Sequence, residues 1–543
     1  MSNSLFARGL NKIKRKKDRE QKKNIRGKYM EYVRTLPVDR SMVLLEARNG
    51  RAIDGNIYYI LRELLSCPDY QGLKLYVVIE DPAAEHAIRT KISVLPKAEH
   101  VAHVTLHSQE YYRVMASAGT IINDATIGNF YIKKEGQVYL NVWHGTPLKT
   151  MGRRVLHEPH ATGNVQKNFI CADYLLYPSE YMMEHMIEDY MIADISGATV
   201  LLGGYPRNIA FFDESQRLDI RGKLAGEASK IYAYMPTWRP GDGGQLQEIL
   251  QSIDRGLASD EMMYVNVHPL AKESVDFGTF DRVRPFPEDT ENYALLNAAD
   301  ALLTDYSSVF YDYAVTGRKI VLFTYDEEEY FATRGLYEPI CSLPFPQVKT
   351  VDAALSGLRS PKAYDDGPFL QKYCPYESAD AAKKICRQVL LGDKCMEERS
   401  VPSNGKPNIL VYGGDLSEGA RTDQTFAFLA DPEKPDGNYY LTFDRKDLKE
   451  RFPILFDLPE GIRYIGRAGT MWMEESQQEA DARYKKGRIS FDEYWGIVRP
   501  AFELQRKRCY GDMRIDRIVQ IPEGKPPGPD ASEIELEFST YEL

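Results

Sequence analysis

The chain has 543 residues, too many for one hydrophobic core, so about two to four domains are expected. Hydrophobic residues make up 43% and charged residues 27%, as in ordinary globular proteins, and the net charge of −10 argues against a general nucleic-acid binder. The seven cysteines lack zinc-ligand spacing and fit reduced thiols in a cytoplasmic compartment, and no apolar run reaches the length of a membrane span or a signal-peptide core.

The first 30 residues are strongly basic. Residues 1–30 contain eleven Lys or Arg and two acids, and they predict an exposed basic helix or tail. Each cation near an anionic leaflet contributes about 1 kcal/mol, so this tail can hold an otherwise acidic protein at a membrane surface. A solvated charge run is the alternative interpretation.

From residue 41 the hydrophobic pattern predicts alternating strands and helices. Strands are expected at residues 42–46, 73–79, 120–123, 138–143, 172–177 and 199–202, with another starting at 104, and helices at 56–65, 108–117 and 179–189. This alternation predicts a parallel sheet covered by helices on both faces. The Gly- and Pro-containing segment 203–207 then breaks the pattern and is the candidate hinge to a second domain.

The same pattern returns after the hinge. Strands are expected at residues 230–234, 263–267, 301–304 and 319–324, and helices at 245–258, 292–298, 305–316 and 378–391. A strand at 408–413 and helices near 475–485 and 491–507 predict half of a further α/β domain. The expected domains are therefore a basic tail (1–30), an N-terminal doubly wound domain (31–204), a second doubly wound domain (205–395), a polar linker (396–406) and an additional α/β domain (407–543).

Polar or cationic residues stand at four of the expected strand ends. These are His144 with Gly145, Arg239, His268, and the turn from Asp305 to Ser308. Because open α/β sheets bind ligands at the carboxyl ends of their strands, we expect all four to face one interdomain cleft. Ser307 and Ser308 would lie at a helix N-terminus, where backbone N–H groups bind phosphate. Lys149, shortly after His144, adds a cation to the same region.

Each of these residues also has a structural interpretation. Either His can be a hydrogen-bonded structural residue, the two Ser can be helix caps, and Arg239 can pair with a surface acid. Other catalytic classes lack their motifs, because the sequence contains no GxxxxGK[ST] loop, no HExxH and no GxSxG, and its nine His are not at metal-ligand spacing. The residues alone leave the choice between site and scaffold open.

Several separate segments in one order carry a family resemblance. They read QVYLNVWHGTPLKTMG, DYLLYPSEYM, GGYPRN, YMPTWR, NVHP, TDYSSVFYDYA and YDEEEYFATRGLY. The chain from about residue 41 to residue 391 thereby resembles the CDP-glycerol glycerophosphotransferases, the teichoic acid primases and polymerases. The resemblance implies an α/β fold that is GT-B-like, with two Rossmann-like doubly wound domains, an interdomain cleft and, outside the family core, a C-terminal partial α/β domain.

The resemblance also implies roles for individual residues. His144 matches the His of the family's WHGTP motif and would be the general base, and His268 matches the HP His and would contact the donor phosphates or stabilise the leaving group. The implied substrate-binding residues are Arg239, Ser307 and Ser308 on the pyrophosphate, then Lys149 and Arg207, with Asp305, Thr237, Gly145 and Thr146 around them. No cofactor and no obligatory metal is expected, since cations and a helix N-terminus can take part of a metal's role.

The implied reaction is transfer of glycerol phosphate, or a related polyol phosphate, from CDP-glycerol or CDP-ribitol to a hydroxyl of a lipid-linked or polymer acceptor, releasing CMP. It would serve the synthesis of a teichoic-acid-like or capsule polymer. The basic tail then becomes a peripheral anchor on an anionic membrane at its cytoplasmic face. No nucleic-acid partner is expected, and a homo-oligomer is left open. The alternatives are a GT-B glycosyltransferase that uses a nucleotide sugar and a non-catalytic membrane-bound scaffold.

Overall fold

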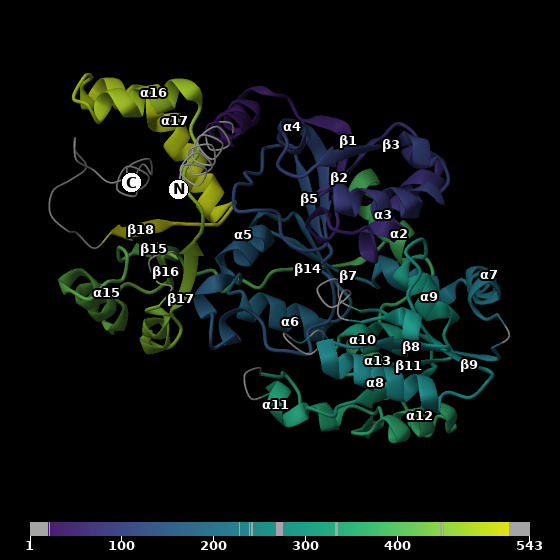
Figure 1. Ribbon diagram of the computed structural model, residues 1–543. Coiled ribbons are helices and arrows are strands. Elements are labelled where there is room, and N and C mark those ends of the chain that lie inside the picture. Colours follow the sequence, from purple (N-terminus) through teal and green to yellow (C-terminus); the bar gives the residue numbers. More distant parts are fainter. Residues whose placement is uncertain are drawn as a thin grey trace, which may run out of the picture.

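A computed structural model describes residues 20, 22–226, 228–237, 239, 243–267, 275–331, 335–445, 448 and 450–520. It contains three sheets (Figure 1). The two larger sheets lie on the right of the view, one above the other, and the third lies on the left. The predicted α/β class, with two doubly wound domains and a partial third, is confirmed.

The N-terminal sheet has eight strands in the order β14-β7-β6-β5-β4-β1-β2-β3, and every pair except β14 with β7 is parallel. The strands are β1 (Asp39–Glu46), β2 (Lys74–Ile79), β3 (Val101–Thr105), β4 (Ala118–Asn123), β5 (Val138–Asn141), β6 (Tyr174–Tyr177), β7 (Thr199–Leu202) and β14 (Glu397–Ser400). The helices are α2 (Asn56–Ser66), α3 (Pro82–Ser93), α4 (Gln109–Ser117), α5 (Gly163–Cys171) and α6 (Glu180–Asp189). The strand order reverses direction between β1 and β4, the position where such sheets bind ligands.

The second sheet has six parallel strands in the order β10-β9-β8-β11-β12-β13. The strands are β8 (Lys230–Met235), β9 (Glu261–Val265), β10 (Val283–Pro285), β11 (Ala301–Thr304), β12 (Lys319–Phe323) and β13 (Gln347–Val348). The helices are α7 (Glu214–Leu224), α8 (Gly243–Gly256), α9 (Asn292–Ala298), α10 (Val309–Ala314), α11 (Glu327–Phe331) and α12 (Val351–Arg359). Here the order reverses between β8 and β11.

The chain then returns to the first domain. Helices α13 (Gly367–Tyr373) and α14 (Ala381–Cys386) follow, and α14 packs against α2 before a π-helical turn (Arg387–Leu391). The segment 396–406, expected as a linker, contains β14, which pairs antiparallel with β7. Its polar sequence, EERS, is exposed along the sheet edge, so it lacked the apolar pattern that identifies a buried strand.

The third sheet is parallel, in the order β17-β16-β15-β18. Its strands are β15 (Asn408–Tyr412), β16 (Asn438–Asp444), β17 (Arg463–Arg467) and β18 (Arg517–Gln520), with helices α15 (Ala420–Ala430), α16 (Glu475–Tyr484) and α17 (Phe491–Tyr510). The start of α5 packs closely on this sheet, since a Cβ added at Gly163 would lie 1.9 Å from the carbonyl oxygen of Gly466.

Part of the predicted basic tail belongs to the folded body. Residues 22–35 are helical, and Tyr29 and Met30, expected in an exposed tail, are buried. Tyr29 packs edge-on against Trp472, and the Arg26 guanidinium lies 5.0 Å above the same indole. The helix thus joins the N-terminal domain to the third domain. Among the described residues, no helix is both long and apolar enough to cross a membrane.

Candidate functional site

A cavity of about 390 Å³ lies between the carboxyl ends of the two larger sheets. The predicted site residues that line it are His144, Gly145, Thr146, Lys149, Thr237, Ser307 and Ser308. A larger cavity of about 790 Å³ separates the N-terminal and third domains, and none of the predicted site residues that the structure describes lines it. The candidate site is therefore chosen by the convergence of strand ends and not by cavity volume.

His144 follows β5, and its imidazole is open to the cavity on one side while protein packs densely around the rest of the ring. Its Nδ1 lies 3.1 Å from the backbone carbonyl oxygen of Asp124, which follows β4. Because a carbonyl oxygen can only accept, Nδ1 carries the hydrogen and donates it, and the lone pair is left on Nε2. A neutral imidazole in this tautomer can accept a proton at Nε2.

The surroundings of His144 favour its neutral form. Desolvation by the packed protein lowers the pKa of His144 to about 4, and the nearby cations Arg207 and Arg48 act in the same direction. The hydrogen bond to Asp124 opposes these effects without outweighing them. The backbone before the ring is strained, since Trp143 has a φ of 47°, and the indole packs 4.2 Å from the imidazole.

The two walls of the cavity meet closely at Gly145. A Cβ added there would lie 3.0 Å from the Ser308 Oγ, so glycine lets the N-terminal wall reach the second domain. Ser308 precedes α10 and makes no capping hydrogen bond to that helix, all of which the structure describes. Ser308 therefore does not act as the helix cap that the sequence left open as an alternative. Both Ser307 and Ser308 line the cavity.

A second contact between the domains runs beside the cavity. The backbone N–H of Thr150 donates to the carbonyl of Gly335 (3.0 Å), and that of Tyr337 donates to the carbonyl of Leu148 (3.2 Å). These bonds surround an antiparallel bridge between Lys149 and Leu336. The Lys149 ammonium lies 5.1 Å above the Tyr330 ring. The predicted cation is thus at the cavity wall, on a backbone held by both domains.

Arg239 and Asp305 are placed behind the cavity wall rather than in it. Arg239 donates from Nη1 to Asp305 (2.9 Å) and from Nη2 to Asp326 (2.9 Å), and its side chain is 10% exposed. Asp305 also accepts hydrogen bonds from the backbone N–H (3.0 Å) and hydroxyl (2.6 Å) of Thr237. In this arrangement Arg239 and Asp305 shape the wall, and the hydroxyl hydrogen of Thr237 is already donated.

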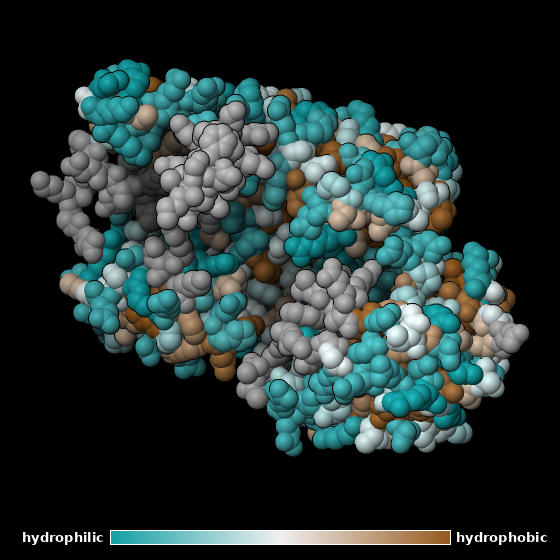
Figure 2. All heavy atoms as spheres, viewed as in Figure 1, coloured by the Kyte–Doolittle hydropathy of each residue, from teal (hydrophilic) through white to brown (hydrophobic). Residues whose placement is uncertain are grey.

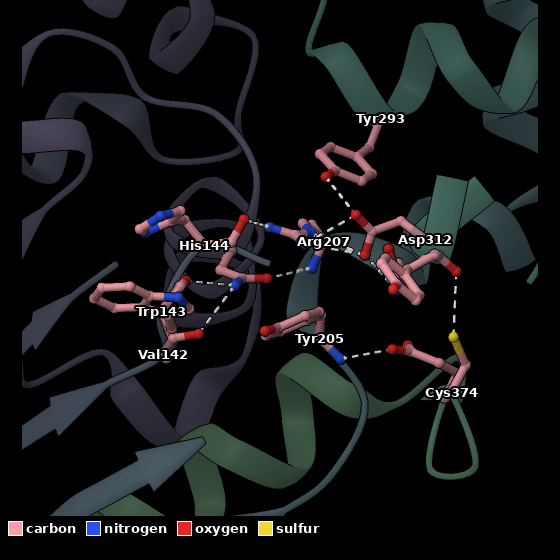
Figure 3. Close-up of polar contacts among 12 residues, drawn as sticks. Val142, Trp143, His144, Tyr205, Arg207, Tyr293, Asp312 and Cys374 are labelled. Carbon is pink, nitrogen blue, oxygen red and sulfur yellow. Dashed lines mark hydrogen bonds and ion pairs between the residues drawn. The ribbon is translucent and has the colours of Figure 1, made fainter. Parts of the chain in front are cut away.

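Arg207 is buried between the two domains (Figure 3). Its Nη1 donates to the backbone carbonyl of His144 (2.9 Å), and its Nη2 donates to both carboxylate oxygens of Asp312 (3.0 and 2.9 Å). Asp312 lies on α10 of the second domain and also accepts from the Tyr293 hydroxyl (3.0 Å). Arg207, expected as a weaker phosphate ligand, is instead placed to position the His144 turn.

Two residues that line the cavity were not predicted from the sequence, and one predicted site residue, His268, cannot be compared with the structure. Arg48, which follows β1, and Asn266, which follows β9, also line the cavity. Arg48 follows the strand expected at residues 42–46, whereas Asn266 lies inside the strand expected at residues 263–267, which ends earlier in the structure. His268 lies outside the described residues.

We expect Arg207→Ala or Asp312→Ala to lower the free energy of unfolding by about 3–5 kcal/mol, because each leaves an uncompensated buried charge. Chemical denaturation of the full-length protein, followed through the unfolding of its two larger domains, would measure this. The control is Arg153→Ala, which removes an exposed pair with Glu188 and should cost about 1 kcal/mol or less. The double variant Arg207→Met with Asp312→Leu should regain part of the stability, and equal costs at exposed and buried pairs would contradict the expectation.

Two known proteins are similar to this chain in sequence. A teichoic acid poly(glycerol phosphate) polymerase of Bacillus subtilis (strain 168) is 27% identical, covering 65% of this chain and 49% of its own length. One of Bacillus spizizenii is 25% identical, covering 65% of this chain and 93% of its own length. The chain thus spans about half of the first relative and most of the second.

The fold also matches a solved structure, that of the wall teichoic acid polymerase TagF, with a TM-score of 0.59 at 22% identity, covering 72% of this chain and 98% of that chain. The family model that matches residues 28–391 is described as CDP-glycerol:poly(glycerophosphate) glycerophosphotransferase. With most of its length inside that match, this chain belongs to the CDP-glycerol:poly(glycerophosphate) glycerophosphotransferase family.

Proposed function

We propose that the protein transfers glycerol phosphate, or a related polyol phosphate such as ribitol phosphate, from a CDP-activated donor to a hydroxyl of a membrane-linked acceptor. The observation that carries this proposal is the interdomain cavity, where the Nε2 lone pair of His144 and the hydroxyls of Ser307 and Ser308 come from opposite walls. Family membership supplies the donor class. The product would be a teichoic-acid-like or capsule polymer.

In the proposed reaction the acceptor oxygen attacks the β-phosphorus of the CDP-polyol. A new phosphorus–oxygen bond forms, and the bond from the β-phosphorus to the bridging oxygen breaks, so that CMP leaves. The acceptor proton passes to Nε2 of His144 and then to solvent. Ser307 and Ser308 donate hydrogen bonds to the donor phosphates, and Lys149 offsets their charge. His268 keeps its expected role at the donor phosphates.

Domain roles follow from the same arrangement. Residues 31–204 form the acceptor side, because they carry the base, and residues 205–395 form the donor side, because Thr237, Ser307 and Ser308 come from them. The additional domain proposed for residues 407–543, of which the structure describes residues up to 520, lies outside the family match.

The basic N-terminus supports a peripheral position on the cytoplasmic face of the cell membrane. In the described part of this segment Lys22, Lys23 and Lys28 are exposed, while Tyr29 and Met30 fix the helix to the body. On the face seen in Figure 2 the surface over α16 and α17, beside this helix, is mainly hydrophilic. Attraction of cations to anionic lipids therefore fits better than insertion of an apolar patch.

The proposed donor class is tested by mass spectrometry of the product. Purified protein would be incubated with a lipid-like acceptor and, in parallel, CDP-glycerol, CDP-ribitol and a UDP-sugar. We expect CMP release and a mass increase of one or more polyol phosphates with a CDP-polyol. His144→Ala should reduce transfer by roughly 10²- to 10⁴-fold while leaving CDP-glycerol binding largely intact. Turnover of the UDP-sugar instead would support a glycosyltransferase, and turnover by neither donor would support a scaffold.

The pH dependence tests the base. His144 must be neutral to accept the proton, and desolvation lowers the pKa of its imidazole to about 4 in the unliganded protein. We therefore expect the limb of kcat/KM that belongs to His144 to lie below about pH 5. Asp124 is the other group whose titration the profile can show, because burial raises the pKa of its carboxyl to about 6. The bound anionic donor favours the imidazolium, so the acidic limb of kcat should lie at higher pH than that of kcat/KM. A kcat/KM limb at or above about 6.5 would contradict the assignment.

Membrane attachment is tested with vesicles containing anionic phospholipid. The double variant Lys22→Gln with Lys23→Gln removes two exposed cations, and it should weaken binding by about 2 kcal/mol at low ionic strength and less at high salt. The control, Lys383→Gln with Lys384→Gln in α14, removes the same charge elsewhere and should bind like the unmodified protein. Equal losses in both variants would mean that overall charge, rather than this helix, is responsible.

A further inference from the structure

Arg48 is an exposed arginine in the cavity wall. It follows β1 at the point where the strand order of the N-terminal sheet reverses, and it lines the cavity together with His144. Its side chain is exposed. Within the part of the chain that the structure describes, no carboxylate forms an ion pair with its guanidinium. An exposed guanidinium beside a reaction site is well suited to bind an anion.

The backbone that carries Arg48 is strained and firmly held. Arg48 and Asn49 have φ values of 46° and 56°, in the left-handed region that is unfavourable for ordinary residues. Gly50 follows with a φ of 79°, and its carbonyl accepts from the N–H of Glu80 (2.8 Å). A Cβ on Gly50 would lie 2.6 Å from that same nitrogen. Such strain persists because the surroundings leave the turn no other conformation.

Asp124 fixes Arg48 and His144 together. Its carboxylate accepts a hydrogen bond from the backbone N–H of Arg48 (2.8 Å), and its backbone carbonyl accepts from Nδ1 of His144 (3.1 Å). The backbone of Arg48 and the proton-accepting imidazole of His144 are therefore both held by one buried residue. The positive charge of Arg48 also contributes to the lowered pKa of His144. An anion bound by Arg48 would lie close to the hydroxyl that His144 deprotonates.

The domain from which Arg48 comes indicates which substrate carries the anion that it would bind. Ser307 and Ser308, which would hold the donor phosphates, come from the second domain, whereas Arg48 and His144 come from the first. We propose that Arg48 forms an acceptor subsite that binds the phosphate group next to the attacking hydroxyl. Arg48 would then favour an acceptor whose attacking hydroxyl lies next to a phosphate over a neutral alcohol. This inference rests on the proposed function and names the acceptor of the same site.

Steady-state kinetics on matched acceptors test the subsite. One acceptor is a lipid-like glycerol phosphodiester, and the other is its methyl triester, which has the same hydroxyl and no charge. We expect Arg48→Ala to lower kcat/KM for the diester by roughly 10- to 100-fold, the range of a charge-assisted hydrogen bond. The KM for CDP-glycerol and the kcat/KM for the triester should change by about twofold or less. Arg48→Lys keeps the charge without the fork and should give an intermediate loss.

Arg51→Ala is the matched control. Arg51 belongs to the same turn, but its guanidinium pairs with Glu80 (2.9 Å) and its side chain is 67% exposed. We expect its kinetics with both acceptors to match those of the unmodified protein. Arg48→Ala should also move the acidic limb of kcat/KM for the triester to higher pH, because a cation that lowers the pKa of His144 is gone. Thermal melting of each variant shows whether the fold is retained.

The subsite is overturned if Arg48→Ala slows both acceptors equally, or if its main effect is a raised KM for CDP-glycerol. Calorimetric titration with a soluble glycerol phosphate dimer, without donor, separates this inference from the proposed function. Binding of the dimer that weakens in Arg48→Ala and not in Arg51→Ala supports the subsite even if no CDP-polyol is turned over. Failure of the unmodified protein to bind the dimer, or equal binding by all variants, overturns it.

Discussion

The buried guanidinium of Arg207 is the contact on which the site depends. It joins the carbonyl of His144 in one domain to the carboxylate of Asp312 in the other, residues that are far apart in the chain. Burial opposes its charge, but attraction to Asp312 outweighs that penalty and raises the pKa of Arg207. The Tyr205 ring, 4.3 Å from the guanidinium, also stabilises the cation. The guanidinium donates to three oxygens, the His144 carbonyl and both carboxylate oxygens of Asp312, and this arrangement suits the planar fork of arginine better than a lysine ammonium.

Prediction from the sequence succeeded where the signal is local. The ends of apolar strands are local features, so the chain order alone located the turns that carry His144, Gly145, Ser307 and Ser308. The structure brings these turns to one cavity, and the α/β fold of two doubly wound domains is confirmed. The catalytic and binding roles of these side chains remain proposals.

Cations were harder to interpret from the sequence. Arg207 and Arg239 lie within the segments GGYPRN and YMPTWR, and nothing local shows whether such a side chain meets a ligand or a carboxylate. Their acidic partners, Asp312 and Asp326, lie 105 and 87 residues further along the chain. Arg48 was missed for the opposite reason, because an exposed arginine after a strand resembles any surface charge. Tertiary pairing, rather than residue type, decides between these cases.

The third domain packs against the N-terminal domain. Phe130 stacks on Trp472 at 5.5 Å, and Arg508 donates to the carbonyl of Asn129 (3.0 Å). Figure 1 shows this domain beside the N-terminal sheet and away from α8 and α12 of the second domain. The family match ends at residue 391, before the third domain begins. Its described contacts therefore make it an extension of the half that carries His144.

The backbone bridge between Lys149 and Leu336 ties the two halves of the protein together at the edge of the cavity. The flanking hydrogen bonds, from Thr150 to Gly335 and from Tyr337 to Leu148, run between main chains and so depend on no particular side chain. Substitutions that change the side chains of the cavity can therefore leave the spacing of its two walls unchanged at this point.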